Sequence, residues 1–115
     1  MRQGALAAMA MAAAALWSSA ASAQSYVVWG IGAERCAAWV DAKRSSDKVQ
    51  RAAYETWAHG FLTGAGFERG GAIMTKASMD RDGVLKWLDD YCEANPRMSI
   101  ERAVVALLGR LGGEK

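Results

Sequence analysis

The chain has 115 residues, with 14 Lys and Arg against 12 Asp and Glu and a formal net charge of +2. Its basic residues are scattered along the sequence, so neither a nucleic-acid surface nor a basic membrane-binding face is supported. The single histidine, His59, leaves a catalytic triad or a His-rich metal site without the residues it needs. We therefore expect a protein that is not an enzyme and that uses no cofactor and no metal.

The first 23 residues are typical of a cleavable secretory signal peptide. Arg2 supplies a positive start, the run from Ala5 to Trp17 is apolar and uncharged, and Ala21-Ser22-Ala23 has the small-x-small pattern of a cleavage site. A membrane anchor is the alternative, but the run is shorter than the roughly 20 residues of a spanning helix. We expect cleavage after Ala23, a single mature domain over 24–115 and a location in the bacterial periplasm.

The mature domain is small enough that a covalent cross-link, which we call the staple, would help to stabilise it. Its conformational entropy nearly cancels what one small core gains. Cys36 and Cys92 are its two cysteines, and the periplasm favours oxidation. A single disulfide between them is the prediction, and two buried thiols or a metal site are the alternatives.

The first helix is predicted over 33–44, where Cys36, Trp39 and Val40 form one apolar stripe. Before it, Gly30-Ile31-Gly32 is expected to be a short lead-in loop. This Gly-x-Gly lacks the third glycine and the preceding strand of a dinucleotide fingerprint. No nucleotide site is predicted there.

A second and longer helix follows the break at Ser45-Ser46. Asp47 and Gln50 have the spacing of a capping box. Val49 begins a series of apolar residues at i+4 steps that continues through Ala53, Trp57 and Phe61. This periodicity predicts that these side chains face the core.

Two glycines, Gly60 and Gly64, interrupt the same helix one turn apart. Each costs about 1 kcal/mol relative to alanine in a helix interior, so their presence needs a reason. Close approach of another backbone within the chain is the favoured interpretation. The alternative is a groove for a partner protein.

A loop is predicted over Gly66–Ser78, because no helical period continues there. Asp80 or Asp82 then caps a third helix that ends before Pro96, since the residue before proline is pushed out of helical geometry. Val84 and Leu88 align on its apolar side.

Ser99 caps the last helix, whose apolar positions follow the most regular helical series of the chain up to Leu111. The predicted fold is all-α, a bundle of about four helices with one disulfide. Most tryptophans lie on or beside the apolar stripes, and an aromatic binding patch is the alternative to core packing for them. The predicted core comprises Trp39, Val49, Trp57, Phe61, Leu88, Val104, Leu107 and Leu108.

The order of short motifs resembles the HdeA/HdeB family over nearly the whole mature chain. The motifs are Cys36-x-x-Trp39, then Trp57-x-x-Gly60-Phe61-x-x-Gly64, then Cys92-x-x-Asn95-Pro96 before an amphipathic last helix. The resemblance implies a periplasmic acid-stress chaperone, often a homodimer near neutral pH, that loosens in acid and binds unfolding client proteins.

A second resemblance is to the Tai-type immunity proteins of type VI secretion, which are also small, exported and helical. It is carried by the Gly-x-x-x-Gly of the second helix and by the segment before the last helix. It implies an immunity or inhibitor protein that binds one specific protein partner. Both resemblances imply protein binding without catalysis, and they differ in the number of partners and in the pH of binding.

Overall fold

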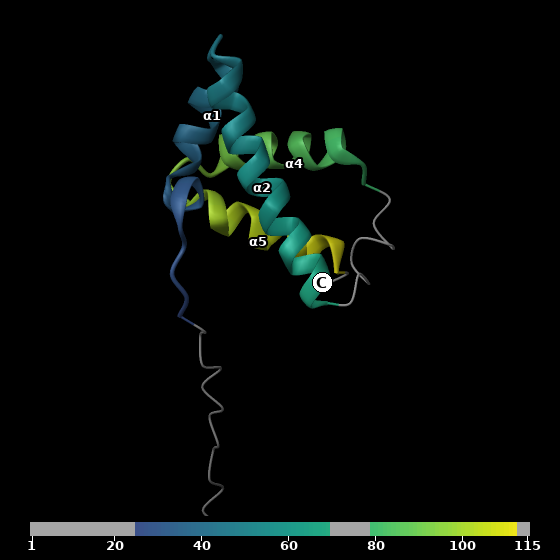
Figure 1. Ribbon diagram of the computed structural model, residues 1–115. Helices are drawn as coiled ribbons and strands as arrows, with labels where there is room; N and C mark the ends of the chain where they lie inside the picture. Colours follow the sequence, from purple (N-terminus) through teal and green to yellow (C-terminus); the bar gives the residue numbers. More distant parts are fainter. Residues whose placement is uncertain (1–24, 70–78, 113–115) are drawn as a thin grey trace, which may run out of the picture.

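The computed structural model describes residues 25–69 and 79–112. The predicted signal peptide and most of the predicted loop Gly66–Ser78 lie outside these ranges. Within them the chain forms four α-helices and one short 3-10 helix (Figure 1). One disulfide links Cys36 to Cys92. The predicted all-α fold is therefore confirmed. None of the described helices combines the length and the apolar character that crossing a bilayer requires.

The elements follow one another with short connections, except between α2 and α4. They are η1 (Gly30–Ala33), α1 (Cys36–Arg44), α2 (Lys48–Glu68), α4 (Arg81–Ala94) and α5 (Ile100–Leu111). Helix α1 packs on α4 and α2, while α5 contacts α4, α2 and η1. In Figure 1, α2 runs diagonally across α4 and α5.

Three helices begin at the capping residues that the sequence predicts. The Asp47 side chain accepts hydrogen bonds from the backbone N–H groups of Val49 and Gln50, and Ser99 accepts from Arg102. Of the two aspartates considered for the third helix, Asp80 is the cap. Each cap satisfies backbone donors that lack a partner inside the helix.

Two predicted boundaries differ from the structure. Helix α1 begins at Cys36, three residues later than predicted, because the start of α1 is tied to the start of α5 instead. Cys36 N donates to Met98 O at 2.7 Å, and Ile100 N donates to Glu34 O at 2.9 Å. Helix α2 continues through Glu68, so the chain is still helical at Gly66, where the loop was predicted to begin.

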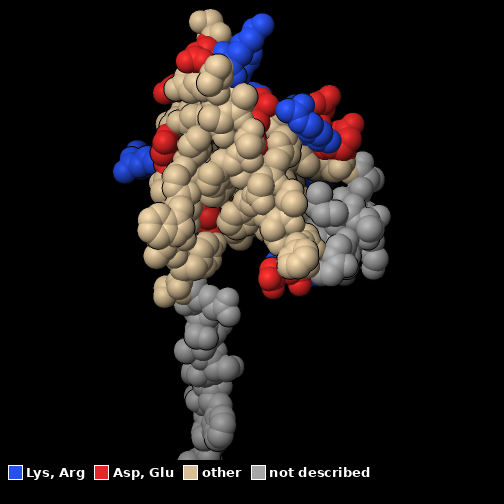
Figure 2. Space-filling view, viewed as in Figure 1, with Lys and Arg blue, Asp and Glu red and all other residues tan. Residues whose placement is uncertain are grey.

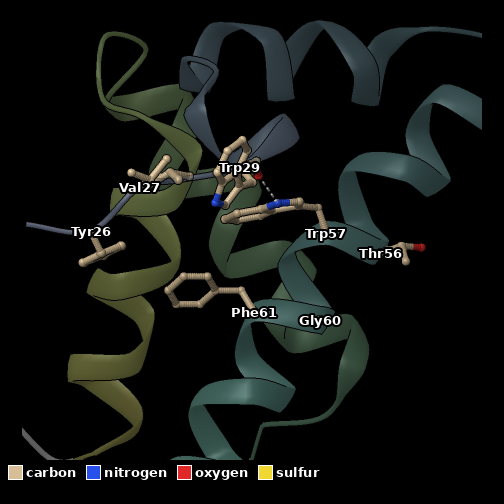
Figure 3. A pocket seen from close by; sticks show the side chains of 8 residues that line it. Tyr26, Val27, Trp29, Thr56, Trp57, Gly60 and Phe61 are labelled. Atoms are coloured by element: carbon tan, nitrogen blue, oxygen red, sulfur yellow. Dashed lines mark hydrogen bonds between the residues drawn. The ribbon is translucent and has the colours of Figure 1, made fainter.

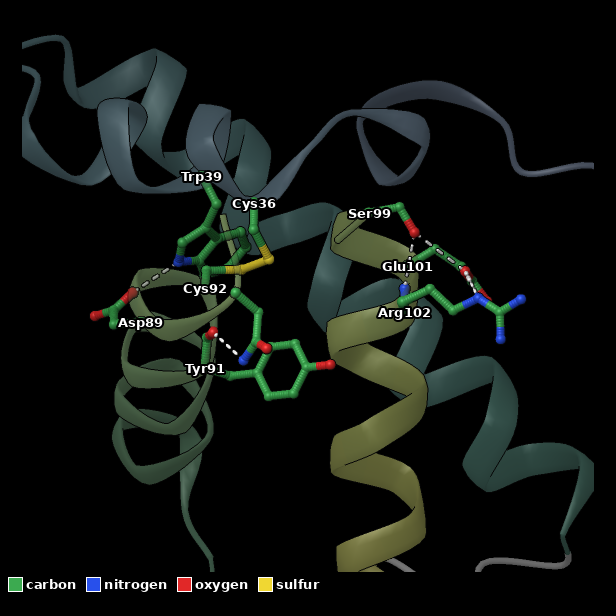
Figure 4. The surroundings of a disulfide bond; sticks show 9 residues. Cys36, Trp39, Asp89, Tyr91, Cys92, Ser99, Glu101 and Arg102 are labelled. Carbon is green, nitrogen blue, oxygen red and sulfur yellow. Dashed lines mark hydrogen bonds and ion pairs between the residues drawn. A yellow bond between two sulfur atoms is a disulfide. The ribbon is translucent and has the colours of Figure 1, made fainter. Parts of the chain in front are cut away.

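The disulfide joins the first residue of α1 to the last turn of α4, and both cysteines are completely buried (Figure 4). Next to it, the Trp39 indole Nε1 donates to Asp89 of α4 at 2.8 Å. Closing a loop of this length stabilises the fold by about 4 kcal/mol in the chain-entropy model. The predicted staple is therefore confirmed and links α1 to α4.

The core lies between the four helices, and α5 contributes more buried side chains to it than any other described helix. Five of the predicted core residues are buried: Trp39, Leu88, Val104, Leu107 and Leu108. Trp57 and Phe61 are half-buried and pack against the edge of the core.

The prediction for Val49 is wrong, because its side chain is 80 % exposed. Helix α2 faces the core with Tyr54, Ala58 and Leu62, a stripe displaced around the helix from the predicted one. Both stripes have helical spacing, so periodicity alone could not choose between them. Packing selects the face on which the Tyr54 and Trp39 rings make a T-shaped contact, with ring centroids 6.4 Å apart.

The prediction of close packing at Gly60 and Gly64 is also wrong. Both glycines are exposed, and a Cβ atom placed on either would have no described neighbour within 4 Å. They face away from the core because α2 buries the opposite side. The surface around both glycines is therefore open in the described part of the chain.

Candidate functional site

An open groove of about 400 Å³ lies between the N-terminal segment and α2 (Figure 3). One wall is the extended segment Tyr26–Trp29, and the other is formed by Thr56, Trp57, Gly60 and Phe61. All of these residues are uncharged, and the walls are 27 positions apart in sequence at their nearest residues, Trp29 and Thr56. The groove therefore depends on the fold that brings the segment onto α2.

Trp57 lines the groove and packs against the two glycines of η1. Gly30 adopts a left-handed conformation with φ of +73°, which favours glycine. Gly32 is buried, and a Cβ atom there would overlap the Trp57 indole ring. The indole Nε1 donates to the backbone carbonyl of Trp29 at 3.0 Å. The Gly-x-Gly is a cradle for an aromatic ring, a role that the sequence analysis missed.

Phe61 lies one turn beyond Trp57, and the two rings are tilted by 31° with centroids 5.5 Å apart. Both rings pack on the core with one side and border the groove with the other. Figure 3 shows the Phe61 ring extending toward Tyr26 across the groove. Such half-buried aromatic rings supply a rigid apolar contact surface.

The N-terminal wall of the groove is itself exposed. Tyr26 is 56 % exposed and Trp29 is 80 % exposed. The Tyr26 hydroxyl donates a hydrogen bond to the Glu101 carboxylate, which raises the pKa of Tyr26 above its ordinary value. Ser99, at the cap of α5, also donates to Glu101 at 3.4 Å (Figure 4).

Glu101 is a residue whose role the sequence analysis did not foresee. It lies in the first turn of α5, where a carboxylate is favoured by the helix dipole. Its side chain is 7 % exposed, and it is the one buried charged residue among those described. It anchors the N-terminal segment to α5, a contact 75 residues apart in sequence that no local pattern reveals.

The groove continues onto a solvent-exposed face of α2, which we call the outer α2 face. Its eight members share exposure to solvent and the absence of charge. They are Val49, Ala52, Ala53, Thr56, Gly60, Thr63, Gly64 and Phe67. Figure 2 shows an uncharged surface along α2, with acidic and basic side chains at its ends and edges. Thr56 and Gly60 belong both to this face and to the groove.

Other polar side chains, His59 among them, do not converge on one site. Asp89 accepts from Trp39, whereas its neighbour Asp90 pairs with Lys86 at 2.8 Å. His59 is half-buried, and its Nε2 atom has no hydrogen-bond partner among the described residues. Across 25–69 and 79–112, no three His, Cys, Asp or Glu side chains are grouped as metal ligands.

The groove and the outer α2 face offer aromatic rings, small side chains and a few hydroxyl groups. This lining suits apolar side chains of another polypeptide, since buried aromatic contacts supply much of the free energy of protein association. Comparisons with protein-family models, with curated proteins and with solved structures find no match for this chain.

Proposed function

We propose that the protein is a non-enzymatic periplasmic protein that loosens in acid and then binds unfolding client proteins. The supporting observation is that carboxylates accept the side-chain hydrogen bonds that join different parts of the fold. In the described ranges, every hydrogen bond between side chains of different elements is accepted by Glu34, Glu55, Asp89 or Glu101. Protonation of four side chains therefore acts on all of these contacts.

Glu55 joins three helices. From α2 it accepts a hydrogen bond from Lys43 of α1 at 2.9 Å and from Arg81 of α4 at 3.4 Å. Lys43 also lies 3.7 Å from Asp89 of α4. Lys43 and Glu55 are mostly buried, with side chains 24 % and 17 % exposed, so solvent screens their attraction less than at an open surface.

Two tyrosines attach further elements in the same way. Tyr54 of α2 donates to Glu34, between η1 and α1, at 2.5 Å. Tyr26 donates to Glu101 of α5. A protonated carboxyl is a weaker acceptor than a carboxylate, because charge-assisted hydrogen bonds are roughly twice as strong as neutral ones. Acid therefore weakens the attachment of α2 and of the N-terminal segment.

Net charge acts in the same direction. Loss of residues 1–23 removes Arg2 from the 14 basic residues, so full protonation of the 12 acidic side chains leaves 13 Lys and Arg and His59, about +14. Self-repulsion at that charge opens a compact domain. The disulfide is insensitive to protonation and keeps α1 joined to α4. We infer an opening in which α2 separates and its core side becomes available to clients.

Acid-induced aggregation of a periplasmic extract tests this proposal. We expect the oxidised protein to keep extract proteins soluble at about pH 2.5, below the ordinary pKa of carboxyl groups, and to have no such effect at pH 7. A variant in which uncharged amides replace two of these carboxylates, Glu55→Gln with Glu101→Gln, is expected to begin keeping extract proteins soluble at a higher pH than the wild type. Equal aggregation with and without the protein at pH 2.5 would contradict the chaperone role.

A second candidate is an immunity or inhibitor protein that binds one specific protein at neutral pH. The observation that favours it is the groove, which is open in the folded state before any acid opening. Capture of one stoichiometric partner at pH 7, lost in the groove variant Trp57→Ala, would support this role. Capture of many proteins at acidic pH alone would support the chaperone role instead.

A further inference from the structure

We propose that the segment Tyr26–Trp29 is a binding edge for an extended, uncharged segment of another polypeptide, which pairs with it along the groove as one β-strand pairs with another. The inference deepens the proposed function and rests on it in one respect, that the ligand is a protein. It adds the means of recognition. The ligand is bound through its backbone, by the folded protein and at neutral pH.

The segment has the side-chain pattern of a strand that lacks a neighbouring strand. Successive side chains of an extended chain point to opposite faces. Tyr26 reaches Glu101 of α5, and Val28 is half-buried. Val27 and Trp29 are 69 % and 80 % exposed, and Trp29 has extended backbone angles, with φ of −97° and ψ of 139°. Side chains that the fold holds thus alternate with side chains that it leaves free.

The backbone of this segment has no partner within the described chain. Among residues 25–69 and 79–112, no hydrogen bond reaches the backbone N–H or C=O groups of Tyr26, Val27 or Val28. Unpaired groups along an extended segment are a template on which another strand can pair. A peptide that adds to such an edge gains its affinity from backbone hydrogen bonds.

Val27 presents the edge that faces the groove. The Trp29 carbonyl accepts a hydrogen bond from Trp57 Nε1 at 3.0 Å, so it points toward α2 (Figure 3). The backbone groups of residues two apart in a strand point to the same edge. We therefore expect the N–H and C=O groups of Val27 to point into the groove, and those of Val28 to point to the opposite edge. A ligand residue opposite Val27 can exchange both backbone hydrogen bonds with it.

The walls of the groove determine which side chains the ligand carries. The described residues that line it are all uncharged, so a charged side chain would lose water there without gaining a partner. Trp57 and Phe61 offer aromatic surface to apolar side chains. The volume of about 400 Å³ lies within the roughly 300–1,000 Å³ of typical ligand sites. An uncharged, apolar segment meets these requirements with little dependence on its sequence.

Binding of a synthetic peptide to the folded, oxidised protein at pH 7 tests the proposal. The probe is a short peptide of alternating valine and threonine, blocked at both ends and labelled for fluorescence anisotropy, because β-branched residues favour an extended chain. We expect the wild type to bind it. Val27→Pro removes the N–H donor that faces the groove, and the hydrogen bond lost with it should weaken peptide binding about tenfold.

Val28→Pro is the matched control, because it makes the same change one residue further along and removes a donor from the opposite edge. It should bind the peptide like the wild type. Neither substitution removes a backbone hydrogen bond of the described chain, and circular dichroism checks that both variants fold. An unchanged affinity of Val27→Pro, or an equal weakening in Val28→Pro, would overturn the proposal.

Hydrogen exchange at single amides of the wild type gives a test without a substitution. The Val27 amide should exchange more slowly when the peptide is bound, and the Val28 amide should not. Protection of Val27 that grows with protein concentration in the absence of peptide would mean that a second copy pairs with this edge. That result would overturn the proposal.

The same peptide separates this inference from the proposed function. A wild type that does not bind the peptide at pH 7, yet keeps extract proteins soluble in acid, would overturn the inference and leave the chaperone role standing. Peptide binding that Val27→Pro weakens, without any protection of the extract in acid, would support the binding edge and contradict the chaperone role.

Discussion

At the scale of single residues, Gly32 leaves the space that the Trp57 ring occupies beside the groove. We expect Gly32→Ala to displace the Trp57 ring, because the added methyl group would occupy the same space. Overpacking of this kind costs about 1–3 kcal/mol. Urea unfolding should show that loss, and tryptophan fluorescence should show a more exposed indole.

Gly60→Ala is the matched control for that substitution. Gly60 has open space around it and lies inside a helix, so alanine there should raise stability by up to about 1 kcal/mol. If the two substitutions had the same effect on unfolding, the cradle around Trp57 would not be a steric one.

Tyr54 makes folding stability depend on pH in the alkaline range. Two effects raise the pKa of Tyr54 from 10.0 to about 12. The larger is its hydrogen bond to Glu34, and the second is its burial. Because the folded-state pKa is the higher one, this stabilisation is fully present below pH 10. It is then lost as the pH rises toward 12.

We expect Tyr54→Phe to lower stability by about 1 kcal/mol at pH 7, through loss of the hydrogen bond. The variant should also lose the part of the stability decline between pH 10 and pH 12 that Tyr54 causes. Urea unfolding across this range measures both effects. Tyr91→Phe is the control and should keep the wild-type decline, and a Tyr54→Phe curve parallel to wild type would refute the assignment.

At the scale of elements, Glu55 holds α1, α2 and α4 together through Lys43 and Arg81. Glu55→Gln removes the charge and keeps the shape. We expect it to lower the free energy of unfolding by about 1 kcal/mol, since Lys43 retains Asp89 as a partner. The loss should shrink at high salt, which chemical unfolding at two salt concentrations can measure.

Asp90→Asn provides the comparison for an exposed pair. Its partner Lys86 lies one turn away on the same helix, and both side chains are more than half exposed. Solvent screens such an exposed pair, so it should contribute little to the free energy of unfolding. An effect of Asp90→Asn as large as that of Glu55→Gln would show that the Glu55 contacts do not join the helices energetically.

The elements themselves were largely predictable, because their signals are local. Caps at Asp47 and Ser99, the stop before Pro96 and the apolar series of α5 each depend on a few neighbouring residues. The face that α2 buries was not predictable. Val49 and Tyr54 both start apolar series at helical spacing, and only the position of Trp39, Glu34 and α5 in space decides between them.

The candidate site was harder to predict than the fold for the same reason. Trp57, Phe61 and Gly60 were singled out, but as core and packing residues rather than as one side of a groove. No role was predicted for the opposite wall, Tyr26–Trp29. Its position depends on contacts of Tyr26 with Glu101 and of Trp29 with Trp57, which are 75 and 28 residues apart in sequence.

At the scale of the whole molecule, the disulfide and the carboxylate contacts join different parts of the fold. The staple joins α1 to α4, whereas Glu55 and the two tyrosine–carboxylate contacts attach α2 and the N-terminal segment. Reduction and acid should therefore loosen different parts of the domain. A variant without the staple separates these two effects.

Cys36→Ala with Cys92→Ala is expected to lower the free energy of unfolding by about 4 kcal/mol, because the loop between the two positions is no longer closed in the unfolded chain. Alanine avoids placing a polar group in sites that are completely buried. Urea unfolding at neutral pH measures the loss, and dithiothreitol should shift the wild type but not the variant. In acid the variant should unfold completely where the wild type keeps α1 and α4 together, which hydrogen exchange at their amides distinguishes. Equal exchange in the two proteins at low pH would mean that the disulfide does not limit the acid opening, and that the noncovalent packing of α1 on α4 holds these helices instead.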